Sequence, residues 1–243
     1  MPRFFVPAAA VHDGRAAVEG DDAAHLARSL RATAGERIVL VDDAGREHGL
    51  LLDRVAADRV EGAVEWSRQA TGEPRIEVHV VQALAKDGMD ELVEALAEMG
   101  AAAIWPVATR RTVVRLDARR AAHRVQRWNA IARNAAGLAG RARMPEVHGL
   151  SDLGDVRAAL PAGARVLVCS TTAQTPLARV DLASTSRVAL CIGPEGGFDP
   201  DELAALDGEQ VHLGPRVLRA RLAGLVALAT VLAAAGEMDG AVP

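Results

Sequence analysis

Three short segments combine glycine, proline and charged residues in a way that suggests a ligand site. They are CIGPEGGF at residues 191–198, LGPRVLR at residues 213–219 and CSTTAQ at residues 169–174. Each contains or follows the end of an apolar run that is typical of a buried strand. Glycines in such loops let a ligand approach the backbone, and α/β proteins bind ligands at the carboxyl ends of parallel strands. We therefore expect these loops to bind a small molecule.

Phosphate does not suit these loops. Neither G-x-x-x-x-G-K-[ST] nor G-x-G-x-x-G is present, and Glu195 in the middle of the first loop would repel a phosphate.

A hydrolase is not supported, because G-x-S-x-G is missing and Ser170 has no evident histidine partner. Cys169 and Cys191 belong to no C-x-x-C pair or histidine cluster, so we expect buried, reduced thiols and no metal site.

Arg219 raises a separate question. It follows Arg216 by three residues at the expected start of the last helix, so the two side chains should share a face there. A cation at a helix N-terminus opposes the helix dipole. Spacing alone leaves two explanations open, a role of Arg219 in the site or an ion pair with a surface acid.

Arginines are concentrated in one segment. The net charge of −4 argues against a protein whose whole surface is basic and binds nucleic acid. Ten arginines and one acid, Asp117, nevertheless lie between Ala108 and Arg143. A solvated helix face usually mixes signs. We therefore favour a polyanion-binding surface over a helix that is merely exposed. The ten are Arg110, Arg111, Arg115, Arg119, Arg120, Arg124, Arg127, Arg133, Arg141 and Arg143.

The rest of the sequence predicts two domains that position these residues. Residues 1–70 alternate apolar runs with turns around one helix near Asp21, which predicts a small β-rich module or barrel. After a turn-rich linker, residues 74–240 predict an α/β domain with a parallel sheet. Its expected strands are 75–83, 102–107, 165–169, 188–192 and 210–213, and its expected helices are 88–99, 117–138, 200–206 and 219–236.

Neither a signal peptide nor a membrane span is expected. The chain enters a strand-like run at once, and its longest apolar stretch, residues 222–236, is too short to cross a bilayer. We expect a cytoplasmic protein.

The segments, taken in order, resemble one known family. Besides the two glycine loops they include RFFV at 3–6, HLARSLR at 25–31, QALAKDGMDELVEALAEMG at 82–100, RRTVVR at 110–115 and RWNAIARNAAGLAGRARMPEV at 127–147. Together they are similar to the SPOUT methyltransferases, specifically the RsmE family, which methylates N3 of a uridine in 16S ribosomal RNA. The shared order covers nearly the whole chain and is stronger evidence than the GPEGG pentapeptide alone.

The resemblance implies a PUA-like β-barrel over residues 1–70 and a trefoil-knotted methyltransferase domain over residues 74–240. It further implies a homodimer that binds S-adenosyl-L-methionine in the knot. This cofactor carries no phosphate, which agrees with the missing P-loop. The residues implied for cofactor binding are Cys169, Ser170, Gly193, Pro194, Glu195, Gly196, Gly197, Leu213, Gly214, Val217 and Leu218.

The implied partner is ribosomal RNA, most simply within the assembled 30S subunit. We expect its phosphates to contact cations of both domains, namely Arg3, Arg28, Arg31, Lys86, Arg110, Arg111, Arg120, Arg124 and Arg127. Methyl transfer to N3 requires loss of the imide proton and stabilisation of the charge left on the carbonyl oxygens. A guanidinium suits that task, so we expect Arg219 to be catalytic, with Arg141 as a second contact to the base.

Departures from the family leave two alternatives. Gly137-Leu138-Ala139 stands where Glu-Gln-Ser is usual, Ala220-Arg221-Leu222-Ala223 stands where Thr-Glu-Thr-Ala is common, and Ser170 stands where an acid is common. The first alternative is a knotted RNA-binding paralogue with weak or lost methyl transfer. The second is a SPOUT methyltransferase with another RNA target.

Overall fold

The computed structural model describes residues 1–239, and its internal contacts divide the chain into two units. Unit 1 contains residues 1–73 and 136–144, and unit 2 contains residues 74–135 and the described residues from 145 onward. The sequence predicts residues 136–144 in the second domain, whereas the contacts assign them to unit 1. Residue 240, the expected end of that domain, lies outside the described residues.

Unit 1 is built on one six-stranded sheet with the order β1-β4-β5-β6-β3-β2. The strands are β1 (Arg3–Val6), β2 (Val11–His12), β3 (Arg15–Glu19), β4 (Arg37–Asp42), β5 (Arg46–Val55) and β6 (Arg59–Gln69). All neighbouring pairs are antiparallel except β1 and β4. Helix α1 (Gly20–Ala24) continues into a π-helical turn at His25–Ser29. This is the expected β-rich module with its single helix.

The core of unit 1 lies between this sheet and α1. Phe4, Leu26, Leu40 and Leu50 are among its buried side chains. Sequence alternation produces this core, because side chains two apart on a strand share a face. Gly49 shows how closely β5 and β6 approach, since a β-carbon there would lie 2.1 Å from Nε1 of Trp66.

Unit 2 is built on a second sheet, in which every pair of neighbouring strands is parallel. Its order is β10-β8-β7-β13-β11-β14-β12, and β9 also pairs with β8. The strands are β7 (Glu77–Ala83), β8 (Ala103–Ala108), β9 (Glu146–Val147), β10 (Ser151–Asp152), β11 (Arg165–Cys169), β12 (Thr175–Pro176), β13 (Arg187–Ile192) and β14 (Glu209–His212).

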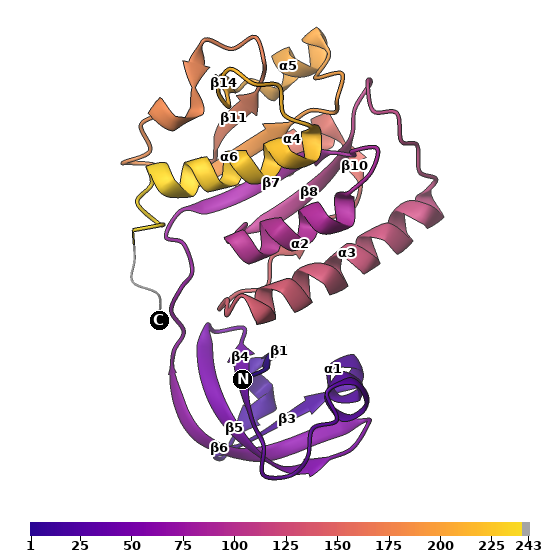
Figure 1. Cartoon of the computed structure of the whole chain (residues 1–243), viewed down its shortest axis with the longest axis vertical. Helices are drawn as coiled ribbons and strands as arrows, with labels where there is room; N and C mark the ends of the chain where they lie inside the picture. Colours follow the sequence, from indigo (N-terminus) through magenta and orange to yellow (C-terminus); the bar gives the residue numbers. More distant parts are fainter. Residues whose placement is uncertain (240–243) are drawn as a thin grey trace. The chain divides into compact units, whose positions relative to one another are not determined.

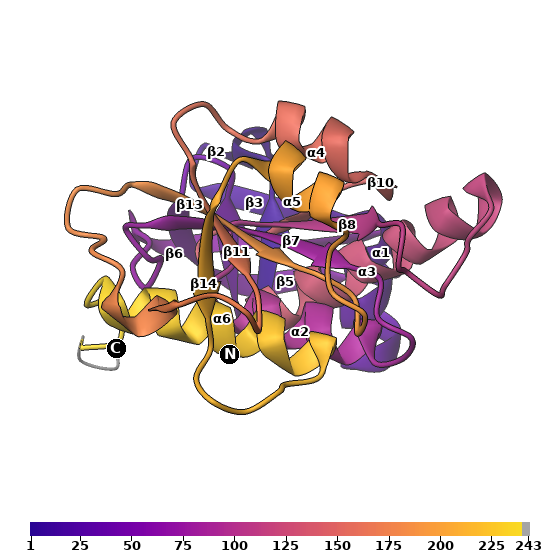
Figure 2. The ribbon, with the colours of Figure 1, turned by 90° about the horizontal axis from the view of Figure 1, so that it is seen from above.

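Helices cover both faces of this sheet, as Figure 2 shows. One core lies on the side of α2 (Met89–Met99), α6 (Ala220–Ala234) and α3 (Ala118–Leu138), with Leu96, Trp128 and Leu228 buried. The other lies on the side of α4 (Leu153–Ala159) and α5 (Pro200–Leu206), with Val156 and Leu206 buried. Figure 1 labels these elements along the chain. Parallel strands buried on both faces explain the continuous apolar runs in the sequence.

The expected helices and strands of unit 2 match the observed ones to within two residues at each end. The sequence pattern does not predict α4 or the two-residue strands β9, β10 and β12, because such short elements carry almost no periodic signal. One detail was wrong. Arg216 and Arg219 do not share a helical face, since α6 begins only at Ala220 and Arg216 lies in the preceding loop. Among residues 1–239, no helix has the length and apolar character needed to span a bilayer.

Candidate functional site

Four neighbouring strands of unit 2 end at one edge of the sheet. In the order β7, β13, β11, β14 they are pairwise parallel, so the loops that follow them leave the sheet at the same side. Those loops are residues 84–88, 193–199, 170–174 and 213–219. The three segments selected from the sequence are therefore brought to one edge, together with the loop that carries Lys86.

The loop after β13 is a compact turn that depends on glycine. The Gly197 N–H donates to the Pro194 carbonyl at 2.8 Å, and Gly197 has a φ of +69°, which favours glycine. A β-carbon on Gly193 would lie 3.1 Å from the backbone nitrogen of Phe198, so the turn leaves it little room. The loop ends at Asp199, which caps α5 in a reciprocal capping box with Glu202. The backbone of this loop is thus held in one shape.

Two arginines from the end of β8 contact this turn. Arg111 Nη1 donates to the Gly196 carbonyl at 2.9 Å, and Arg110 Nη1 pairs with Asp199 at 2.9 Å and with Asp201 at 2.7 Å. The hydrogen bond to Asp201 and the charges of both acids raise the pKa of Arg110. Both arginines were expected to bind RNA, but here their donors serve the glycine turn and the start of α5.

The loop after β14 is held far less. Gly214, with a φ of +99°, donates its N–H to Nδ1 of His212 at 3.1 Å. Leu213 and Leu218 are half-buried, whereas the Val217 residue is 84% exposed. Arg219 is the N-cap residue of α6 and is exposed. Within residues 1–239 no side chain joins residues 213–219 to another element by a hydrogen bond or an ion pair.

Unpaired cations gather around this loop. In the described part of the chain, Lys86, Arg216, Arg219 and Arg221 have no ion-pair partner, and all four are exposed. Arg221 packs over the loop after β7, because a β-carbon on Gly88 would lie 2.8 Å from its Cδ. In the sequence, Arg221 stands out only as a departure from the family, since nothing in the neighbouring residues predicts this contact.

The loop after β11 completes the edge. Ser170 donates its backbone N–H to the Val211 carbonyl at 2.9 Å, and its hydroxyl lies 2.9 Å from Oγ1 of Thr172. Cys169 is half-buried and Cys191 is buried. Burial raises the pKa of each thiol to about 12, so both stay protonated and unreactive near neutral pH. Both cysteines are free, as the sequence predicts, but only Cys191 is buried as expected.

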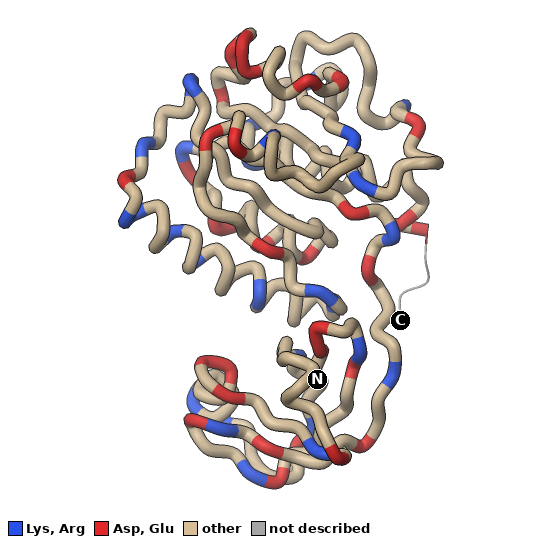
Figure 3. The backbone as a smooth tube through the Cα atoms, turned by 180° about the vertical axis from the view of Figure 1, so that it is seen from behind, with Lys and Arg blue, Asp and Glu red and all other residues tan. Residues whose placement is uncertain are grey.

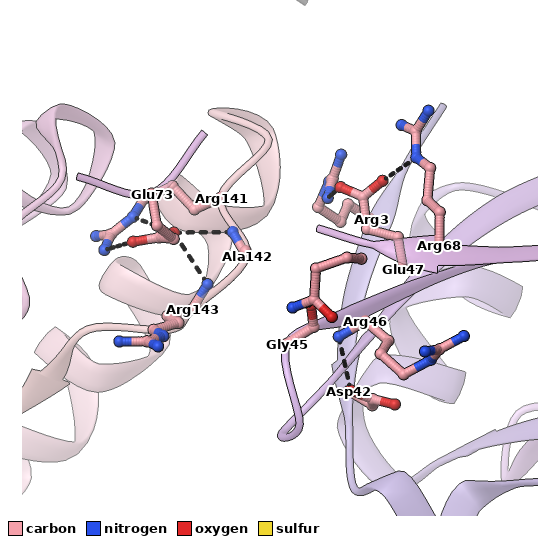
Figure 4. Close-up of polar contacts among 11 residues, drawn as sticks. Arg3, Asp42, Gly45, Arg46, Glu47, Arg68, Glu73, Arg141, Ala142 and Arg143 are labelled. Atoms are coloured by element: carbon pink, nitrogen blue, oxygen red, sulfur yellow. Dashed lines mark hydrogen bonds and ion pairs between the residues drawn. The ribbon is translucent and has the colours of Figure 1, made fainter. Parts of the chain in front are cut away.

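Arg141 lies in unit 1 and is almost completely buried. Glu73 accepts hydrogen bonds from Arg141 Nη2 at 2.8 Å and Nε at 3.2 Å, and from the backbone N–H groups of Ala142 and Arg143. Figure 4 shows this carboxylate at the centre of the 141–143 turn. Because these guanidinium donors are used internally, Arg141 orders the turn in this conformation and does not present a free fork to a base.

The three arginines of unit 1 that were expected to bind RNA differ in whether a carboxylate already pairs with them. Arg3 pairs with the buried carboxylate of Glu47, which also accepts from Arg68 Nε at 2.8 Å (Figure 4). Burial of Glu47 raises its pKa, but the hydrogen bonds from both arginines outweigh this and lower it overall. Arg28 and Arg31 are exposed and, within the described residues, unpaired.

Helix α3 carries a basic stripe, visible in Figure 3 as repeated blue segments along one helix. Arg120 lies 3.4 Å from Asp117, and Arg127 pairs with Asp90 at 2.7 Å. Arg124, one turn from each, is exposed and has no ion-pair partner in the described chain. The stripe therefore mixes neutralised and free cations.

Unit 1 contains a serine–histidine–aspartate chain that the sequence analysis missed. His48 Nδ1 lies 2.8 Å from Ser67 Oγ, and His48 Nε2 lies 3.0 Å from Asp42 Oδ2. The other Asp42 oxygen accepts N–H bonds from Ala44 and Arg46. The chain thus fixes the turn between β4 and β5 and joins cross-strand partners. Residues facing each other across strands cannot be paired from sequence spacing alone. Among the described residues, no three or more histidine, cysteine, aspartate or glutamate side chains form a group that could hold a metal ion.

Comparisons with known proteins agree on one family. A family model described as an RNA methyltransferase domain matches residues 72–232, and one described as an RNA methyltransferase PUA domain matches residues 18–48. "Ribosomal RNA small subunit methyltransferase E" of Mycobacterium tuberculosis is 37% identical over 226 residues, which cover 89% of this chain and 85% of that protein. The protein of the same name from Bacillus subtilis is 28% identical and covers 88% of each chain.

A solved structure shows the same similarity. The ribosomal RNA small subunit methyltransferase E from Neisseria gonorrhoeae, bound to S-adenosyl methionine, superposes with a TM-score of 0.84 at 26% identity, covering 96% of this chain and 97% of the other. The expected α/β fold with a parallel sheet and a β-rich PUA-like domain is confirmed.

Proposed function

Since the chain belongs to the RNA methyltransferase family, we propose that it transfers a methyl group from S-adenosyl-L-methionine to N3 of a uridine in 16S ribosomal RNA. One observation carries the proposal. A preformed glycine turn follows β13 and an unpaired guanidinium, Arg219, follows β14, and these two strands flank β11 and end at the same edge of the sheet. The first suits a cofactor bound through backbone, and the second suits the charge that develops on the base.

The loops fit the proposed cofactor. S-adenosyl-L-methionine carries no phosphate, and its bound form supplies an electrophilic methyl group on a sulfonium. A β-carbon on Gly193 would meet backbone atoms of Gly197 and Phe198, and one on Gly197 would meet no atom within 4 Å, so the backbone at Gly197 is open to a ligand. We assign cofactor contacts to Cys169, Ser170, Gly193, Pro194, Glu195, Gly196, Gly197, Leu213, Gly214, Val217 and Leu218.

Arg219 is the proposed catalytic residue. The N3 imide must lose its proton, and the resulting charge spreads to two carbonyl oxygens. A guanidinium stays protonated and can donate parallel hydrogen bonds to adjacent acceptors. Arg219 is exposed and free of carboxylates among residues 1–239, so its donors are available. Arg141 is the weaker assignment, because Glu73 already occupies its guanidinium.

RNA is proposed to lie along free cations. On unit 2 these include Lys86, Arg124, Arg216 and Arg221, and on unit 1 Arg28 and Arg31. Arg3, Arg120 and Arg127 could exchange a carboxylate for a phosphate, at the cost of breaking an ion pair. The target base must leave its stack to reach the site. This function implies a cytoplasmic protein that acts on the 30S subunit.

A homodimer is part of the proposal. Leu222, Val226, Ala229 and Ala233 follow helical spacing along α6 and are not fully buried, and Leu222 is 46% exposed. A second copy is proposed to cover this stripe. Leu222→Glu should then shift the molar mass measured by light scattering toward the monomer, and an unchanged mass would count against this surface.

The deciding experiment is methyl transfer to 30S subunits from a strain that lacks the gene. The RNA is digested to nucleosides, and N3-methyluridine is measured by mass spectrometry. Transfer should require the protein and S-adenosyl-L-methionine and should rise with pH as the imide ionises. A paralogue without catalysis, favoured by Arg221 and by the 84% exposed Leu138 at positions that are usually polar, would bind cofactor and RNA without turnover. Methylation of another nucleotide would indicate a different RNA target.

A further inference from the structure

The segment between β8 and α3, residues 109–117, begins with a turn that two buried threonines hold closed. Thr109 and Thr112 are buried, the Thr109 N–H donates to Thr112 Oγ1 at 3.0 Å, and their hydroxyl oxygens lie 2.9 Å apart. This closes the turn and leaves Arg110 and Arg111 at its outer side. The buried contact between Thr109 and Thr112 thus positions Arg110 and Arg111 on the exposed side of the turn.

Both arginines contact the glycine turn or the helix that follows it. The backbone N–H of Arg110 donates to Glu202 Oε1 at 2.8 Å, in addition to its side-chain pairs with Asp199 and Asp201. Arg111 reaches the Gly196 carbonyl, and its Nη2 lies 3.8 Å from Asp199. These side chains are about half exposed, at 61% and 46%, so their ion pairs contribute little stability.

The geometry of one peptide group is more informative than the charges. The Gly196 carbonyl and the Gly197 N–H belong to the same planar peptide. Arg111 binds its oxygen at 2.9 Å, and the Pro194 carbonyl accepts its N–H at 2.8 Å. Both flanking residues are glycines, which impose few restrictions on their own dihedral angles. Without Arg111, one end of this peptide loses its protein partner.

We propose that Arg111 is a positioning residue that locks the Gly196–Gly197 peptide, and so sets the affinity of the glycine turn for an adenosyl ligand. It does not act as an RNA phosphate contact. Arg110 supports it by holding residues 109–117 against the acidic start of α5. The identity of the ligand rests on the proposed function, whereas the locking of the peptide does not.

The first test compares Arg111→Met with the matched control Arg179→Met, an exposed arginine without an ion pair in the described residues. The affinity of the full-length protein for S-adenosylhomocysteine is measured by calorimetry. Arg111→Met should weaken it about tenfold, Arg111→Lys should restore part of it, and Arg179→Met should leave it unchanged. In the methyl-transfer assay, Arg111→Met should raise KM for S-adenosyl-L-methionine while kcat at saturation stays within about twofold.

Two further readouts separate this idea from its rivals. Hydrogen exchange of the ligand-free protein should be faster within residues 193–198 in Arg111→Met, with little change elsewhere. The dependence of RNA affinity on salt should keep the parent's slope, whereas loss of a phosphate contact would reduce it by about one unit.

The idea is overturned if exchange and S-adenosylhomocysteine affinity are unchanged, or if only the salt slope falls. If the parent protein does not bind S-adenosylhomocysteine, the proposed function fails, and the exchange experiment still decides whether Arg111 locks the peptide.

Discussion

The loops after β13 and β14 follow a similar design in sequence, yet they differ in how they are held. The first, residues 193–199, has an internal turn, a capping box and contacts from Arg110 and Arg111. The second, residues 213–219, has one local bond from Gly214 to His212 and an almost fully exposed Val217. Gly-Pro opens both, so the difference arises outside the shared motif.

This difference indicates a division of tasks. A loop whose backbone is already fixed loses little conformational entropy when a ligand binds, which favours cofactor affinity. A loop with free cations and few contacts can adapt to a large partner such as RNA. We therefore assign affinity for the cofactor mainly to the first loop, and contact with the base mainly to the second.

Arg219→Ala should have the largest effect. Removing one donor that stabilises a developing charge costs about 2.7–4 kcal/mol, or about 10²–10³ in kcat. The affinity for S-adenosylhomocysteine should not change, because the Arg219 side chain is not among the proposed cofactor contacts. Arg216→Ala, in the same loop and also unpaired, is the matched control and should reduce kcat much less. Full activity in Arg219→Ala would remove this residue from the catalytic assignment.

Gly193→Ala should have the next largest effect, and on binding. The added β-carbon would lie 3.1–3.3 Å from backbone atoms of Gly197 and Phe198, so the turn must shift. We expect S-adenosylhomocysteine to bind more than tenfold more weakly, about 1.4 kcal/mol, in calorimetry. Gly154→Ala in α4, where a β-carbon would meet no atom within 4 Å, is the control. Equal affinities in the two variants would contradict a backbone cradle at Gly193.

Much of this architecture could be predicted from the sequence. Long apolar runs and their turns gave the parallel strands, and Asp199-Pro200 with Glu202 predicted the start of α5 because capping is local. The contrast between the loops could not be predicted. It depends on Arg111 meeting a carbonyl 85 residues away in the chain. The burial of the Arg141 donors was hidden for the same reason, because their partner Glu73 lies 68 residues away. Clustered arginines look alike in sequence whether they are paired or free.

Helix α3 tests the same distinction between paired and free cations. Arg124→Ala should reduce the slope of log affinity for RNA against log salt by about one unit, if it contacts a phosphate. Arg127→Ala should reduce it less, because Asp90 already neutralises this guanidinium at 2.7 Å. Binding is measured by fluorescence anisotropy with a labelled 16S fragment at several salt concentrations. Equal slopes for Arg124→Ala and the parent would return this part of α3 to an ordinary solvated face.

The smallest effect is expected at two histidines that contact Trp105 of β8. It fixes the pH range in which the two loops can be compared. Trp105 donates to His79 Nδ1 at 3.3 Å and stacks on His148 with ring centres 3.5 Å apart. Burial lowers the pKa of both histidines, although Glu77 opposes this at His79 and Glu146 opposes it at His148, while Arg187 adds to it at His79.

The sign of the resulting pH dependence follows directly. As the pH falls through about 6.5, the ordinary pKa of histidine, each imidazole takes up a proton in the unfolded chain. In the folded chain it takes up that proton only at a lower pH, so acid favours the unfolded state. Stability is therefore complete above that pH and falls as the pH drops below it. His148→Phe keeps an aromatic ring on Trp105 but cannot titrate, so its urea midpoint should fall less between pH 7.5 and pH 5.5 than the parent's. Parallel midpoints would show that His148 does not contribute. Because this loss lies on the acid side, an increase of methyl transfer above pH 7 would report ionisation of the uridine imide and not a change in folding.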